Sequence, residues 1–266
     1  MLKDIFQYEF MKNAFLAILC ISPLLGLLGT MVVQKRMAYF SDALGHCALT
    51  GVAIGVILSL SDLNIAMVIF GWVFALILNR IRRKKLLSSD TVISVLASAG
   101  MAVGLAILSR NGTFSNYSAM LVGDVLSIKR SELLWLFILL LFGTGFFLYF
   151  LNSLTAMSIH ETLAKSSNIR VNLVEDIFSM LIATVVMLSI RWVGILLISA
   201  LFILPAAASR NISENMREYT AYTIIFSLFS GILGLVLSYM VNIATGPVIV
   251  MIAAVIFFGT YIYGKK

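Results

Sequence analysis

Residues 37–60 read MAYFSDALGHCALTGVAIGVILSL, and this stretch decides how the rest of the chain is interpreted. It is apolar over a length that matches the about 20 residues a helix needs to cross a bilayer. Its first half nevertheless contains Asp42 and His46, which are four residues apart and therefore share one face of a helix. A carboxylate within the hydrocarbon layer is costly, so such a residue normally faces a bundle interior, a partner or an ion pathway.

Asp42 and His46 together offer one oxygen and one nitrogen, ligand types that zinc and manganese-like cations accept. Gly45, Gly51 and Gly55 keep this helix thin, which lets neighbouring backbones pack close to it. A second interpretation stays open, in which Asp42 caps or pairs near the membrane surface and His46 is a hydrogen-bonded packing residue. We favour an ion pathway, because an ionisable group inside a span marks function by default.

The composition of the chain is that of a membrane protein with several spans. Its 266 residues are 61% hydrophobic and 12% charged, and the mean hydropathy is +1.04. The net charge of +7 does not indicate a nucleic-acid partner, because Lys and Arg excess in such proteins records which loops stay cytoplasmic. No cleavable signal is evident at the N-terminus. Cys20 and Cys47 both lie in apolar stretches, so no disulfide framework is expected, and Cys47 is interpreted as a small buried residue.

The apolar stretches predict an all-α fold, a polytopic bundle of about nine transmembrane helices surrounded by lipid. They lie at 14–33, 37–60, 63–79, 91–109, 131–151, 173–190, 192–208, 219–241 and 246–263. With the N-terminus outside, the Lys and Arg residues divide thirteen to six in favour of the inner side. The positive-inside rule therefore predicts an outside N-terminus and a cytoplasmic C-terminus, with RIRRKK at 80–85 as the strongest anchor.

Two loops carry further signals. The external segment 110–130 contains Asp124, which could line an outer vestibule or could equally be a turn or capping residue. On the inner side, Ser158 followed by Glu161 is a capping-box pattern and predicts a short helix from Ile159. Asn168 can adopt the left-handed conformation that ends a helix. A helix over about 158–168 would be either a docking element for a cytoplasmic partner or an amphipathic surface helix without one.

Several catalytic motifs are missing from the sequence. No GxxxxGK[ST] phosphate loop occurs, so the chain does not bind ATP by that route. There is also no HExxH, GxSxG or CxxC pattern, and an intramembrane enzyme is poorly supported. We therefore expect a protein that is not itself an enzyme.

Four blocks of sequence resemble one known family. They are RMAYFSDALGHCALTGVAIG at 36–55, VGDVL at 122–126, VGILLISALFILPAAASRN at 193–211 and ATGPVIV at 244–250. They are similar to the permease subunit of bacterial ABC importers for zinc, manganese and iron, and the similarity runs over nearly the whole chain. The resemblance implies a single transmembrane permease domain over 1–266 in the bacterial cytoplasmic membrane. It also implies a second copy of the chain, a separate cytoplasmic ATP-binding subunit and an extracytoplasmic metal-binding protein as partners.

The resemblance also suggests roles for individual residues. Asp42 and His46 fall on the acidic and histidine positions that the family links to metal passage. Glu161 and Ala164 fall in the segment that looks like the family's ATPase-coupling helix, where Asn168 replaces a frequent glycine. Gly45 replaces a serine that many relatives carry, which removes a possible hydroxyl ligand. In a homodimer, the two acids and two imidazoles would suffice for four-coordination of one ion.

The resulting hypothesis is an ATP-driven importer of a divalent transition metal, with no permanently bound cofactor and with zinc, manganese or iron as cargo. All three metals accept oxygen and nitrogen ligands, so the sequence does not select among them. The alternative is a secondary, proton-coupled metal transporter that uses Asp42 and His46 as a proton relay and needs no ATPase.

Overall fold

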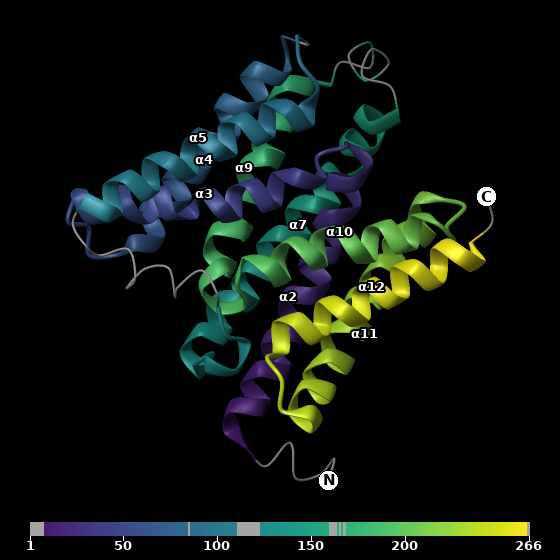
Figure 1. The fold of residues 1–266 in the computed structure, drawn as a ribbon. Coiled ribbons are helices and arrows are strands. Elements are labelled where there is room, and N and C mark those ends of the chain that lie inside the picture. The colour runs from purple at the N-terminus through teal and green to yellow at the C-terminus, as the bar shows by residue number, and fades with distance from the viewer. Residues whose placement is uncertain are drawn as a thin grey trace. The chain divides into compact units, whose positions relative to one another are not determined.

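The computed structural model describes residues 8–84, 86–110, 123–159, 164, 166 and 169–264. Over these residues the chain is all helical, without a β-strand (Figure 1). The elements are α2 (Glu9–Gln34), α3 (Ala38–Ile57), α4 (Leu63–Arg82), α5 (Ser89–Arg110), the 3₁₀ turn η1 (Val125–Ser127), α7 (Arg130–Ile159), α9 (Val171–Val193), α10 (Ile195–Arg210), α11 (Met216–Val241) and α12 (Thr245–Tyr263). The predicted all-α membrane fold is confirmed.

Each of the nine predicted apolar stretches coincides with one of these α-helices, and eight are long and apolar enough to cross a membrane. The ninth, α10, has 16 residues. At 1.5 Å per residue it is about 24 Å long, shorter than the hydrocarbon layer of about 30 Å. The predicted boundary between the sixth and seventh stretches is shifted, because α9 continues to Val193 and Gly194 with φ 81° then separates it from α10. Glycine adopts such a positive φ without steric cost.

The contacts of the chain divide into two compact units. Unit 1 comprises the described residues of Met1–Val33, Asp124–Leu148 and Trp192–Lys266, and unit 2 comprises those of Gln34–Gly123 and Tyr149–Arg191. Each unit is described by itself. The prediction of a single permease domain over the whole chain stays a prediction.

Unit 2 is built on close packing of α3 against α5. The Thr50 hydroxyl on α3 donates to the Gly100 carbonyl on α5. A Cβ atom on Gly104 would lie 2.7 Å from the backbone nitrogen of Thr50, so only glycine permits this approach. Cys47 is buried, as predicted, and its thiol donates to the Ala97 carbonyl with an Sγ–O distance of 3.3 Å.

Unit 1 has α2 as its most buried long helix, packed against α10 and α11. A Cβ atom on Gly29 of α2 would lie 2.1 Å from the Phe202 carbonyl oxygen of α10, which places the two backbones in direct contact. The Ser227 hydroxyl of α11 donates to the Ser22 carbonyl of α2 at 2.6 Å. Small residues thus bring the helices together and hydroxyl groups bond across them, as is typical of membrane bundles.

Hydrogen bonds between helix ends in unit 1 agree with helices that cross the membrane in alternating directions. In unit 1, the Tyr219 hydroxyl near the start of α11 donates to the Thr30 carbonyl near the end of α2. The Tyr219 carbonyl in turn accepts from Ser209 near the end of α10. At other ends, the Asn13 amide near the start of α2 donates to the Ile128 carbonyl just before α7. These pairings are the ones that successive crossings require, whereas the choice of cytoplasmic side stays a charge-based prediction.

Candidate functional site

The Asp42–His46 pair lies on the first half of α3, on its exposed face. The Asp42 Oδ2 and His46 Nε2 atoms are 3.6 Å apart, and the two side chains are 44% and 49% exposed. Tyr39, one turn earlier, is also exposed. Residues 39, 42 and 46 follow helical spacing, so they form one continuous strip along α3. The sequence prediction that the acid and the imidazole share a face is confirmed.

The rest of this half of α3 is packed inside the protein. Phe40, Leu44 and Cys47 are fully buried, and 13 of the 20 residues of α3 are buried. The exposed strip is therefore the part of the helix that the chain's own packing leaves uncovered. A carboxylate within a membrane span normally faces a bundle interior, a partner or an ion pathway.

The described residues contain no group of three or more His, Cys, Asp or Glu side chains able to hold a metal ion. The Asp42–His46 pair therefore brings together one carboxylate oxygen and one imidazole nitrogen from a single chain. Zinc sites in proteins normally have four ligands, or three and a water molecule. A zinc site at this pair would need further ligands from outside the chain.

Asp124 belongs to unit 1 and caps the η1 turn. Its side chain accepts a hydrogen bond from the backbone N–H of Leu126 at 3.0 Å, and the residue is exposed. This is the capping role that the sequence left open for it. A part for Asp124 in an outer vestibule stays a prediction.

The predicted start of a short helix at Ile159 is wrong. Ser158 lies inside the last turn of α7, which continues to Ile159, and its hydroxyl donates to the Thr155 carbonyl at 2.7 Å. Because the hydroxyl bonds back to the preceding turn, Ser158 does not act as an N-cap. Glu161 and Asn168 lie outside the described residues. Ala164 is helical and buried, and its carbonyl accepts from the Ile169 N–H at 3.2 Å.

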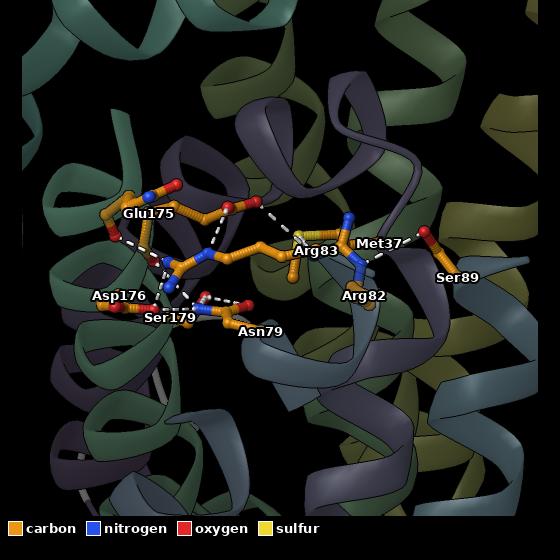
Figure 2. A network of polar contacts seen from close by, with 9 residues as sticks. Met37, Asn79, Arg82, Arg83, Ser89, Glu175, Asp176 and Ser179 are labelled. Carbon is orange, nitrogen blue, oxygen red and sulfur yellow. Dashed lines mark hydrogen bonds and ion pairs between the residues drawn. The ribbon is translucent and has the colours of Figure 1, made fainter. Parts of the chain in front are cut away.

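A second polar group in unit 2 was not predicted from the sequence (Figure 2). We call it the α4–α9 cluster, and it consists of Asn79, Arg82, Arg83, Glu175, Asp176 and Ser179. Arg83 Nη2 lies 2.6 Å from Asp176 Oδ1, and its Nε lies 3.8 Å from Glu175 Oε2. Fully buried Asn79 donates to Asp176 Oδ1 at 3.0 Å and to the Ser179 hydroxyl at 3.1 Å. The cluster joins the end of α4 to the second turn of α9.

The sequence contained a signal for this cluster. Glu175 and Asp176 are two adjacent acids inside the apolar stretch 173–190, which calls for cationic partners. Arg82 and Arg83 were interpreted as topology anchors, because basic residues beside a span usually have that role. No spacing rule pairs residues more than 90 positions apart, so the partnership itself required the tertiary structure.

Known proteins match this chain over almost its full length. The membrane protein ZnuB of a high-affinity zinc uptake system in Haemophilus influenzae is 32% identical, over 94% of this chain and 96% of its own length. The manganese transport system membrane protein MntC of Listeria monocytogenes is 25% identical, over 100% and 94% respectively. A solved structure titled PsaBC from Streptococcus pneumoniae in complex with Fab matches with a TM-score of 0.85 and 25% identity, covering 98% of this chain and 95% of that one.

The family comparison agrees with these matches. The model of the ABC 3 transport family matches residues 7–264. The relatives are named as membrane proteins of transport systems, so the expectation of a multi-pass transport subunit that is not an enzyme is confirmed. By this match and by its fold, the chain belongs to the ABC 3 transport family.

Proposed function

We propose that this chain is the membrane-spanning subunit of an ATP-driven importer of divalent transition metal ions, with zinc or manganese as the first cargoes to test. The relatives named for zinc and manganese uptake align with nearly the whole chain, which supports a shared cargo class. Iron remains within the same ligand chemistry, because oxygen and nitrogen donors accept all three ions.

The Asp42–His46 strip of α3 is the observation that carries the proposal. It presents a carboxylate and an imidazole 3.6 Å apart, on the uncovered face of a helix that is otherwise packed. The carboxylate offsets part of the hydration that the ion loses, and the neutral imidazole supplies a nitrogen ligand. A transport path must also release its ion, so we expect coordination at this pair to be transient.

A second copy of the chain completes this site in our proposal. Two-fold association through the exposed strip would bring two acids and two imidazoles to one ion, which satisfies four-coordination. The same association removes the exposed carboxylates from lipid. The dimer interface is therefore placed along residues 39–46 of α3.

Two further partners follow from the proposal. The chain lacks a phosphate loop, so ATP hydrolysis takes place in a separate cytoplasmic subunit, which contacts the segment around 158–168. An extracytoplasmic protein delivers the metal on the opposite side of the bacterial cytoplasmic membrane. The distribution of Lys and Arg supports a cytoplasmic C-terminus and an N-terminus outside.

The test is metal uptake by the complex of this chain with its ATP-binding subunit, reconstituted in proteoliposomes. Asp42→Asn and His46→Gln keep the size of each side chain while changing its ligand chemistry. We expect each to lower zinc or manganese uptake by at least about tenfold, the factor that 1.4 kcal/mol of lost transition-state stabilisation produces. Asp62→Asn is the matched control, because it removes a carboxylate outside the α3 strip. The Asp62 side chain caps α4 by accepting a hydrogen bond from the Asn64 N–H.

Uptake at the wild-type rate in both α3 variants, with normal assembly, would refute the site.

The energy source for uptake is tested in the same vesicles. Uptake that needs ATP and continues after the proton gradient is collapsed supports the importer. Uptake that continues without ATP and stops with the gradient supports the proton-coupled alternative.

A further inference from the structure

The chain that enters α9 is bonded to the first turn of that helix. The Val171 N–H donates to the Ile169 carbonyl at 2.8 Å, and the Leu173 and Val174 N–H groups donate to the Arg170 carbonyl at 3.0 Å. Upstream, the Ile169 N–H reaches the carbonyl of buried Ala164. These backbone hydrogen bonds connect Ala164, through Ile169 and Arg170, to the start of α9.

The second turn of α9 is then held by the end of α4. Glu175 and Asp176 face Arg82 and Arg83, and the four side chains are between 15% and 27% exposed. Arg83 Nη2 also donates to the Asn172 carbonyl at 2.7 Å, so one guanidinium binds both a side chain and the backbone of α9. The charges also match the helix dipoles, since the cations lie at the end of α4 and the acids near the start of α9.

Arg82 extends the contacts to α3, the helix of the metal-ligand pair. Its Nη1 lies 3.2 Å from the Met37 sulfur, and its Nε donates to the Ser89 hydroxyl at 3.1 Å (Figure 2). Met37 is the N-cap residue of α3, and Ser89 is the first residue of α5. The starts of α3, α5 and α9 and the end of α4 thus meet at these two arginines, all within unit 2.

Removing one partner from the ion pairs between α4 and α9 has a large free-energy cost. When a mostly buried ion pair loses one partner, the remaining charge is left without compensation, which is strongly unfavourable. Asn79, which is fully buried, adds a second donor to Asp176. The four helix ends are therefore expected to move together and not to slide past one another.

We propose that the α4–α9 cluster is the mechanical link that transmits movement of the segment around Ala164 to α3 and so to Asp42 and His46. The inference rests on the proposed function, in which an ATP-binding subunit contacts that segment. Arg82, Arg83, Glu175 and Asp176 are positioning residues in this role, since they act on the transport path through α3. A merely stabilising cluster would affect how much complex forms, whereas a link determines how much metal moves for each ATP hydrolysed.

The first experiment measures metal transported per ATP hydrolysed by the reconstituted complex, with Zn²⁺ and Mn²⁺ as probes. The variants are Arg83→Gln, Asp176→Asn and the double variant, and Arg83→Lys keeps the charge. Arg80→Gln is the matched control, because Arg80 lies on the same helix and is exposed. We expect a ratio about tenfold lower in each single variant, no further loss in the double variant and partial recovery with lysine. An unchanged ratio in Arg83→Gln, with normal assembly, would overturn the proposal.

The second experiment follows α3 itself and does not depend on transport. A Tyr39→Cys variant, labelled with an environment-sensitive fluorophore, reports on the exposed strip. The background carries Cys20→Ala, and Cys47 needs no replacement because it is fully buried. We expect ATP to change the fluorescence of the otherwise unchanged complex, and Arg83→Gln to abolish that change while Arg80→Gln retains it. A fluorescence response that persists in Arg83→Gln refutes the link. If the wild-type complex takes up no Zn²⁺ or Mn²⁺ but gives the expected fluorescence results, the proposed cargo is refuted and the link is supported.

Discussion

Replacing Gly29 by alanine should separate α2 from α10. The added Cβ would lie 2.1 Å from the Phe202 carbonyl oxygen, 2.9 Å from its carbonyl carbon and 3.2 Å from its Cα. All three atoms belong to the backbone, so no rotamer change relieves the overlap. The helices must move apart by about 1 Å in an interior that is packed like a crystal. Overpacking of this kind typically costs about 1–3 kcal/mol.

The Gly29→Ala substitution also has a stabilising effect, the higher helix propensity of alanine, and this effect is smaller than the clash. A contact of 2.1 Å with a backbone oxygen places the overpacking cost at the upper end of its range, about 2–3 kcal/mol. Alanine favours a helix over glycine by about 1 kcal/mol at most, so the net loss of stability is expected to be about 1–2 kcal/mol. Gly145→Ala on α7 is the matched control, because its Cβ would have nothing within 4 Å. That variant keeps the propensity gain without the clash and should be neutral or slightly more stable.

The assay for both glycine variants is thermal unfolding of the detergent-purified protein, followed by size-exclusion chromatography with fluorescence detection. A loss of 1–2 kcal/mol corresponds to a Tm lowered by about 2–8 °C for a chain of this size class. The reasoning is refuted if Gly29→Ala melts at or above the wild-type temperature. It is also refuted if Gly145→Ala falls as far as Gly29→Ala, since the effect would then belong to glycine replacement in general.

Three further substitutions test other contacts by the same thermal assay. Gly104→Ala should lower the Tm, because the new Cβ would lie 2.7 Å from the backbone nitrogen of Thr50, and a Tm equal to wild type would show that α3 and α5 can separate freely. Asn215→Ala should cost about 1 kcal/mol, because the Asn215 side chain accepts from the Glu218 N–H at the start of α11. Asn79→Ala should cost about 1–3 kcal/mol by removing a buried donor from the α4–α9 cluster, and an unchanged Tm would contradict the burial argument.

The helices and the shared face of Asp42 and His46 could be predicted from the sequence for a simple reason. A membrane span needs a long apolar run whatever its neighbours are, so the nine stretches predicted the nine α-helices of the described chain. The spacing of four residues between Asp42 and His46 places them on one helical face before any packing is known. Both conclusions depend on local geometry alone.

Other features were decided by the tertiary structure. The capping-box pattern at Ser158 was overridden because α7 continues through that residue and engages its hydroxyl. The partnership of Arg83 with Asp176 joins residues that are 93 positions apart, and no periodicity encodes such a pair. Which face of α3 stays uncovered depends on how α4 and α5 pack against it. The sequence by itself therefore determined the spans and the shared face of the acid and the imidazole, because helical periodicity is local. Only the tertiary structure decided which faces and charges meet, because burial and pairing depend on distant segments.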